Sequence, residues 1–194
     1  GIMEHADKDG KTVRECLKEC GIDPDHVDDA KLPEGYAKAH LELHIEQGAV
    51  LESKGLSVGV VTGICCQIRG EVTIKGTASH AGTTPMDLRK DALAAAAECM
   101  LEIEDEAKKY PQAVATVGKI TAFPGGVNVV PGEVKFSIDM RNQKAALRDA
   151  MFDKCVERMK AVCEKRGVSL DVNVLMKDDE GKPCADHIQD IVAE

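Results

Sequence analysis

Aromatic and basic residues are scarce in this 194-residue sequence, which has no tryptophan, two tyrosines, three phenylalanines, and 25 Lys and Arg against 34 Asp and Glu. Proteins that bind nucleic acids present a basic stripe or aromatic side chains on which bases stack. With a net charge of −9 and no basic cluster, the sequence excludes nucleic-acid partners. Long apolar runs and a secretory signal are also missing, so we expect a cytoplasmic protein with no membrane contact.

The eight cysteines show neither the spacing of a zinc ribbon nor that of a compact disulfide framework. They form no CxxC pair, and most lie in helix-like or strand-like stretches, where a free cysteine behaves as a small hydrophobic residue. We interpret them as reduced thiols of a cytosolic protein. The cysteines are Cys16, Cys20, Cys65, Cys66, Cys99, Cys155, Cys163 and Cys184.

Strand-like and helix-like hydrophobic patterns alternate in a recognisable order from about residue 69 onward. The expected elements are a strand at 71–76, a helix at 91–110, strands at 113–123 and 133–141, a helix at 144–166 and a strand at 169–176. This is the order of the split βαβ, ferredoxin-like (βαββαβ) fold, with four antiparallel strands and both helices on one face. We therefore predict an α+β domain.

The flanking stretches do not make a domain by themselves. Within 1–68 we predict a helix at 11–20, a strand at 40–47, a short helix near 49–53 and a buried strand in the apolar run 56–66. The last residues resemble the first turns of another helix. The pattern indicates a domain at 69–177 inserted into a larger parent domain, of which 1–68 and 178–194 are parts.

The segment "HLELHIEQG" at 40–48 alternates aliphatic residues with two histidines and two glutamates. As a strand it would place all four ionisable groups on one face. That face is either a wet edge or the rim of a metal site, because a neutral imidazole binds divalent metals. Spacing alone leaves both interpretations of His44 open.

Two further motifs place polar groups on constrained loops. In "SHAGTTP", His80 could donate a hydrogen bond to a carbonyl oxygen that gains negative charge; alternatively, the hydroxyl residues of this loop only cap the next helix. In "PGGVNVVPG", Asn128 offers a donor and an acceptor from a Gly/Pro frame, although an ordinary turn asparagine fits the spacing equally well.

The fourth motif, "DMRN", places an arginine at the end of an alternating strand. The planar guanidinium of Arg141 could hold a carboxylate through two parallel hydrogen bonds. The alternative is a surface ion pair with Asp139 or Glu133.

Taken together and in this order, "ELHIEQG", "SHAGTTPM.LRKD", "GGVNVVPG" and "DMRN" resemble the amidase family of N-carbamoyl-L-amino-acid hydrolases and allantoate amidohydrolases, within the M20-type dinuclear metallohydrolases. The resemblance implies that His44 is a metal ligand and that Gln47 contacts substrate. It implies that His80 stabilises the oxyanion, while Asn128 and Arg141 bind the substrate carboxylate. It also implies two divalent metal ions (zinc, manganese, cobalt or nickel) and a lid domain that forms a homodimer.

Other family elements are interpreted as missing. These are a His-x-Asp metal motif upstream of His44, a Glu-Glu pair that supplies the general base, and a final metal histidine downstream; His187 lies too early for that role. We therefore expect an internal segment of a longer enzyme, inactive by itself. Its three parts would be catalytic domain (1–68), lid (69–177) and returning catalytic segment (178–194).

The resemblance implies hydrolysis of the carbamoyl C–N bond of an N-carbamoyl-L-amino acid. Allantoate or ureidoglycine processing is the alternative within enzymes. A non-catalytic module for dimerisation and carboxylate binding is the alternative outside them. The expected dimer is symmetric and uses the helix at 91–109 with a neighbouring strand. That helix carries an apolar stripe of Leu93, Ala97, Met100, Leu101 and Ala107.

Overall fold

The computed structural model describes residues 2–194 and divides into two compact units, one up to Gly55 and one from Leu56 to Glu194. The helices of the first unit are all short, and an isolated β-bridge joins Ala6 to Thr12. These helices are η1 (Ile2–Glu4), α1 (Val13–Glu19), η2 (Val27–Ala30) and α2 (Val50–Ser53). The N-terminus of α1 is a capping box, in which Thr12 and Glu15 each bond the other's backbone N–H. Gly21, at φ +75°, follows α1, and this confirms the predicted helix.

The strand predicted at 40–47 is wrong. These residues are extended but belong to no sheet, and Leu41, Leu43 and Ile45 are 66%, 98% and 73% exposed. A strand exists only where a neighbour accepts and donates its backbone hydrogen bonds, and no other described segment pairs with this one. The alternation of side chains therefore creates no buried face here.

The apolar run at 56–66 is also not the buried strand that was predicted. Val58 and Val61 are 76% and 60% exposed. Only β1 (Gly63–Ile64) forms a ladder, pairing with β9 (Lys182–Pro183). The backbone enters a long strand at Cys66, after this short pair.

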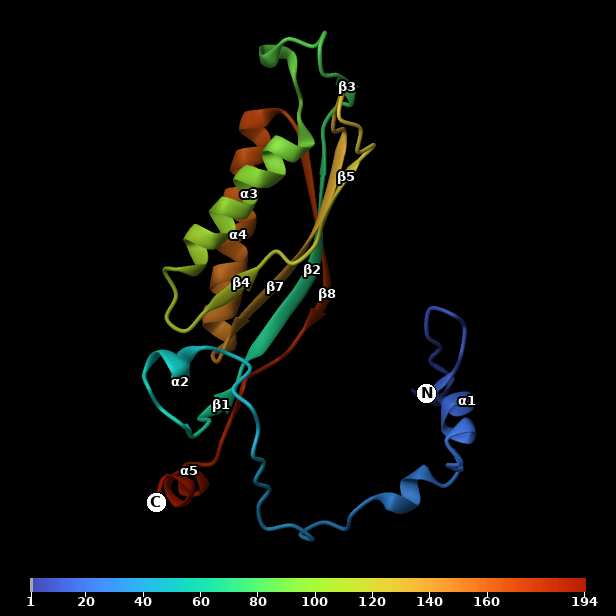
Figure 1. Ribbon diagram of the computed structural model, residues 1–194, viewed down its shortest axis with the longest axis vertical. Helices are drawn as coiled ribbons and strands as arrows, with labels where there is room; N and C mark the ends of the chain where they lie inside the picture. Colours follow the sequence, from blue (N-terminus) through green and yellow to red (C-terminus); the bar gives the residue numbers. More distant parts are fainter. Residues whose placement is uncertain (1) are drawn as a thin grey trace. The chain divides into compact units, whose positions relative to one another are not determined.

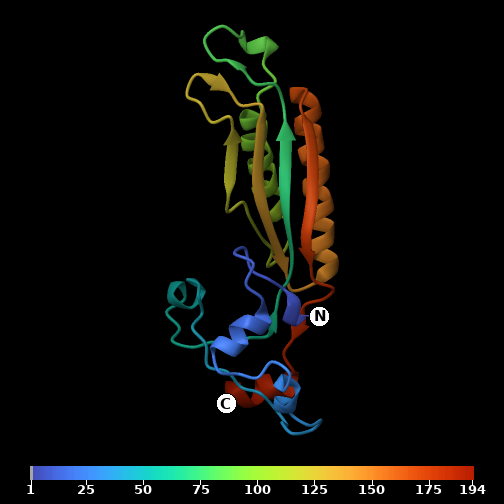
Figure 2. The ribbon, with the colours of Figure 1, turned by 90° about the vertical axis from the view of Figure 1, so that its right-hand side faces the viewer.

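The second unit is built on an antiparallel sheet whose strands are ordered β4, β7, β2 and β8, with β5 also paired to β7. Both long helices cover one face of this sheet, as Figures 1 and 2 show from perpendicular directions. The elements are β2 (Cys66–Lys75), β3 (Ser79–His80), η3 (Met86–Leu88), α3 (Ala92–Ala107), β4 (Val114–Thr116), β5 (Ile120–Phe123), β6 (Val129–Val130), β7 (Glu133–Asn142), α4 (Ala145–Arg166), β8 (Ser169–Lys177) and α5 (Asp186–Ala193). The predicted α+β architecture is confirmed.

Alternation along β2 and β7 separates a core face from a polar face. Val72 lies opposite Phe136 in the ladder, and both are almost fully buried beneath the helices. The next pair, Thr73 and Lys135, points to the opposite face. Because the side-chain period of a strand is two, every second rung faces away from the helices. The predicted strand at 113–123 is divided into β4 and β5, which pair with successive parts of β7.

The helix α3 packs through small residues, and its predicted stripe divides between two faces. Its buried residues are Ala92, Ala95, Ala96, Cys99, Ile103, Glu106 and Ala107. Leu93 and Leu101 instead lie outside the core, 38% and 65% exposed. The helix therefore has a core side of small residues and a second, exposed apolar strip.

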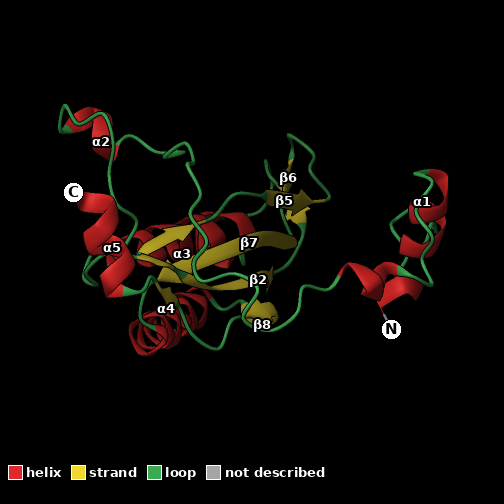
Figure 3. Ribbon diagram, turned by 90° about the horizontal axis from the view of Figure 1, so that it is seen from below, coloured by secondary structure: helices red, strands yellow, loops and turns green. Residues whose placement is uncertain are grey.

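Glycine ends α4 as the sequence predicts. Gly167 has φ +64° and its N–H bonds the last turn, a geometry that favours glycine at this position. In Figure 1 the C-terminal helix α5 lies beyond β1, and Figure 3 shows this helix from below. Among residues 2–194, no helix is both long enough and apolar enough to span a membrane.

Candidate functional site

His80 lies at the end of the short β3–β6 ladder, opposite Val129. Its Nδ1 is 3.1 Å from the backbone nitrogen of Gly82. An N–H donates, so Nδ1 must accept, and the imidazole proton is then on Nε2. An exposed Nε2–H on a fixed ring can donate to an oxygen that becomes negatively charged. The local geometry thus supplies the tautomer that the predicted oxyanion role requires.

The loop after His80 is held by several side-chain bonds. Arg89 donates to the carbonyl oxygens of Ala81 (2.6 Å) and Thr84 (3.1 Å), and the Thr84 hydroxyl donates to the His80 carbonyl oxygen (2.8 Å). The cap of α3 is Asp91, which accepts two backbone N–H groups. The Thr84 hydroxyl therefore braces the loop rather than capping the helix.

Asn128 is tied to the same loop. The backbone N–H of Ala81 donates to the Asn128 carbonyl oxygen at 2.9 Å, and both His80 and Asn128 are exposed. Asn128 lies directly before β6, so the β3–β6 ladder also fixes its position. The structure brings these two predicted site residues together.

Arg141 is bound to Asp139 on the polar face of β7. Its Nε donates to Oδ1 (2.7 Å) and its Nη2 to Oδ2 (2.8 Å), while Arg69 of β2 donates to Oδ2 at 3.0 Å. The bonds from Arg141, and then from Arg69, lower the pKa of the Asp139 carboxyl, although partial burial opposes them. The ion pair considered as an alternative is therefore present, whereas Glu133 lies near Lys75.

Arg141 and His80 lie near opposite ends of the sheet. The ladder that holds His80 precedes Glu133, the first residue of β7, and Arg141 is the ninth of its ten residues. Eight residues of strand span about 26 Å. Arg141 and Asn128 of one chain therefore do not meet at one small carboxylate.

His44 and Gln47 belong to the first unit, and both are exposed. His44 Nδ1 is 2.6 Å from the carbonyl oxygen of Ile45, which can only accept, so Nε2 keeps the lone pair that a metal would bind. Glu46 instead accepts the backbone N–H groups of Val50 and Leu51 at the start of α2. Gln47 has φ +52°, a rare conformation for a residue with a side chain.

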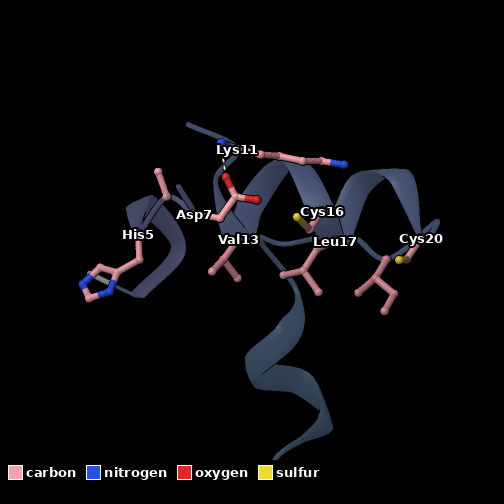
Figure 4. Close-up of a pocket in the computed structure, with 9 residues that line it drawn as sticks. His5, Asp7, Lys11, Val13, Cys16, Leu17 and Cys20 are labelled. Carbon is pink, nitrogen blue, oxygen red and sulfur yellow. Dashed lines mark hydrogen bonds between the residues drawn. The ribbon is translucent and has the colours of Figure 1, made fainter. Parts of the chain in front are cut away.

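His5 and Asp7 form a His-x-Asp spacing upstream of His44, so the interpretation that this spacing is missing was wrong. They do not converge, as Figure 4 shows. The Asp7 carboxylate accepts the backbone N–H groups of Lys11 and Asp9, and these two bonds lower its pKa, the bond from Lys11 most strongly. Both residues border a groove of about 360 Å³ beside the apolar side of α1.

The described residues do not form a metal centre. Across 2–194 there is no group of three or more His, Cys, Asp or Glu side chains placed to hold an ion. A dinuclear site needs several protein donors. His44 alone does not fit that requirement, so no chemical step is assigned to a metal here.

A family model described as the peptidase dimerisation domain matches residues 63–167. The chain belongs to the hydantoinase/carbamoylase amidase family and carries its M20-type dimerisation domain. It is 45% identical over 168 residues to an N-carbamoyl-L-amino acid amidohydrolase of Geobacillus stearothermophilus, covering 87% of this chain and 41% of the relative. It is 38% identical over 184 residues to the allantoate amidohydrolase of Escherichia coli (strain K12), covering 94% and 44%.

A solved hydantoinase/carbamoylase family amidase from Burkholderia ambifaria has a matching fold, with a TM-score of 0.86 and 33% identity. The match covers 99% of this chain and 46% of that one. The chain thus spans less than half the length of these relatives. The chain is therefore a homologue of N-carbamoyl-L-amino acid and allantoate amidohydrolases.

Sequence reasoning missed Arg69 and Gly82 as parts of the candidate site. Arg69 is adjacent to Asp139 only through the cross-strand register, which the sequence does not give. Gly82 stands two residues after His80, and a Cβ there would lie 3.1 Å from the ring carbon Cε1. The tripeptide "HAG" at 80–82 could have indicated Gly82, because a residue without a side chain lets its backbone N–H approach the imidazole.

Proposed function

We propose that this chain is part of a metal-dependent amidohydrolase that cleaves the carbamoyl C–N bond of N-carbamoyl-L-amino acids. In this proposal, residues 69–177 are a ferredoxin-like lid and dimerisation domain, and 1–68 and 178–194 belong to the catalytic domain. The strand order β4, β7, β2, β8 supports the ferredoxin-like assignment. The names of the relatives support the substrate class.

The observation that carries the proposal is the fixed tautomer of His80. Its Nε2–H would donate to the carbonyl oxygen of the ureido group as that oxygen becomes negatively charged. Because the ring is oriented before substrate arrives, no reorganisation is needed at that step. Arg141 would bind the substrate carboxylate, with Asn128 and Gln47 as further polar contacts.

The separation within one chain supports a site shared by two copies. A substrate of this class is much shorter than the roughly 26 Å that separates Arg141 from the His80 end of the sheet. In a symmetric dimer, the His80 and Asn128 end of one lid can meet the Arg141 end of its partner. We infer a homodimer in which each site uses both lids.

Divalent metal ions bound by the longer protein would supply Lewis-acid chemistry to this site. His44 is the proposed ligand among the described residues. The remaining ligands and the general base would come from the rest of the longer protein, and this chain's own residues bind and orient the substrate.

The test is a substrate panel on a full-length enzyme that contains these residues, loaded with zinc or manganese. We expect turnover of N-carbamoyl-L-amino acids to exceed that of allantoate. We also expect Arg141→Ala to weaken the binding of substrates that carry a free carboxylate and to leave the metal content unchanged. Preference for allantoate would favour the second candidate, which the 38% identical relative supports. If Arg141→Ala lowered activity toward carboxylate and carboxamide substrates equally, the proposed role of Arg141 would be refuted.

A further inference from the structure

The polar face of the sheet holds a compact group of one carboxylate and two guanidinium groups. Arg69 lies directly across from Asp139 in the β2–β7 register, and Arg141 follows two residues later on the same face of β7. Their side chains are 49%, 27% and 43% exposed for Arg69, Asp139 and Arg141. The carboxylate is the least exposed member, and both cations remain open to solvent.

A guanidinium group has two edges that can hold a carboxylate. The inner edge consists of Nε–H and one N–H of the nearer terminal nitrogen, and the outer edge consists of the two terminal nitrogens. Asp139 accepts from Nε and Nη2 of Arg141, so it occupies the inner edge. Among residues 2–194 none accepts a hydrogen bond from Nη1 of Arg141, so the outer edge remains able to bind a second carboxylate in bidentate fashion.

The charges in this group also favour an incoming anion. Two guanidinium groups and one carboxylate leave a net charge of +1. Arg69 donates to the same Oδ2 that accepts from Arg141, so Asp139 is held from both strands. Three hydrogen bonds from two arginines thus hold the Asp139 carboxylate beside Arg141.

We propose that Asp139 is a positioning residue, which holds Arg141 by its inner edge so that the outer edge faces the substrate carboxylate. This rests on the proposed function, in which Arg141 binds that carboxylate. Arg69 anchors Asp139 and does not itself touch the substrate. The ion pair is therefore part of the binding site and does not compete with it.

A competing role for Asp139 makes the opposite prediction. If Asp139 blocked Arg141, its replacement would free the guanidinium and substrate would bind more tightly. If it positions Arg141, replacement lets a flexible side chain move and substrate binds more weakly. The direction of the change in KM distinguishes the two roles.

The experiment measures kcat and KM for an N-carbamoyl-L-amino acid and for its carboxamide in the metal-loaded full-length enzyme. For Asp139→Asn we expect KM for the carboxylate substrate to rise about tenfold, the loss of roughly one charge-assisted hydrogen bond. The kcat and the KM for the carboxamide should stay within about threefold, because the reacting groups are untouched. Glu133→Gln, on the same face at the other end of β7, is the matched control and should leave KM unchanged.

The possible outcomes distinguish a failure of the positioning role of Asp139 from a failure of the proposed function. If Arg141→Ala raises KM for the carboxylate substrate and Asp139→Asn does not, or if Asp139→Asn lowers KM, the positioning role is wrong and the proposed function stands. If Arg141→Ala has no effect, the proposed function itself fails. Should Asp139→Asn not fold, Arg69→Ala removes one anchor of Asp139. It should then raise KM about threefold with kcat unchanged, and an unchanged KM would overturn the proposal.

Discussion

The exposed apolar strip on α3 makes a specific prediction about self-association. Leu93 and Leu101 are exposed on this helix, and Val114 and Ile120, 56% and 46% exposed, lie on β4 and β5. These two strands form one edge of the sheet, on the side where α3 packs. An apolar helix strip beside an open strand edge is a surface that a second copy can cover. We expect this surface to form the dimer.

Replacing Leu101 by Glu measures how much that surface contributes. Leu101 is 65% exposed, so covering it buries about two thirds of its side chain, worth roughly 1–2 kcal/mol in each copy. Both copies lose this contribution in a two-fold symmetric dimer. The dimerisation free energy is therefore weakened by about 2–4 kcal/mol, before any cost of burying the new carboxylate. The dissociation constant should therefore rise about 30-fold to 1,000-fold.

Sedimentation equilibrium of the 194-residue chain at tens of micromolar is the assay. The matched control is Leu175→Glu, because Leu175 is 68% exposed on β8, at the opposite edge of the sheet. We expect a dimer for the parent chain and the control and a monomer for Leu101→Glu. A monomeric parent chain, or a dimer that only Leu175→Glu disrupts, would refute the assigned surface.

Three further predictions follow from particular contacts. Gly82→Ala should lower kcat of the full-length enzyme about tenfold without a change in Tm, because a Cβ 3.1 Å from His80 Cε1 must shift the ring; unchanged kcat would contradict this. Glu106, bound to Lys109 and Arg158, has a lowered pKa, so its stabilisation exists at neutral pH and is lost as pH falls below the ordinary value of 4.5. Urea unfolding of Glu106→Gln should therefore show a stability deficit of about 1–3 kcal/mol at pH 7 that shrinks in this acid range, whereas a constant deficit would count against the ion pairs. The chain alone should retain far less than one equivalent of zinc or manganese after dialysis and should not hydrolyse N-carbamoyl amino acids; stoichiometric metal with turnover would disprove this.

Most of the second unit could be predicted because its signals are local. Alternation through Val134, Phe136, Ile138 and Met140 reports a strand with one buried face, and Gly167 reports the end of α4. The segment 40–47 has an equally clear alternation, yet it forms no strand, since pairing depends on a partner that the segment itself cannot supply. A local pattern therefore predicts the tendency of a segment to form a strand, whereas a sheet also requires a second segment that pairs with it.

The candidate site was predictable as a set of residues but not as an arrangement. The motifs predicted His80, Asn128 and Arg141 as site residues, but only the fold shows that Arg141 lies far from His80 and Asn128. The Nε2–H tautomer of His80 and the Arg69–Asp139 contact depend on backbone geometry and strand register, which no spacing in the sequence encodes. The Leu93 and Leu101 strip was visible as apolar, but its exposure follows from which side of α3 the small alanines occupy.

Subunit complementation tests the shared site most directly. Arg141→Ala and His80→Ala full-length enzymes, each nearly inactive, are mixed, dissociated and reassociated, and hydrolysis of an N-carbamoyl-L-amino acid is then measured. If each site takes Arg141 from one copy and His80 from its partner, half the dimers are mixed and each has one intact site, so activity should return to about a quarter of the wild-type value. If both residues serve a site within one copy, every site carries a substitution, and the mixture would remain as inactive as its two parents.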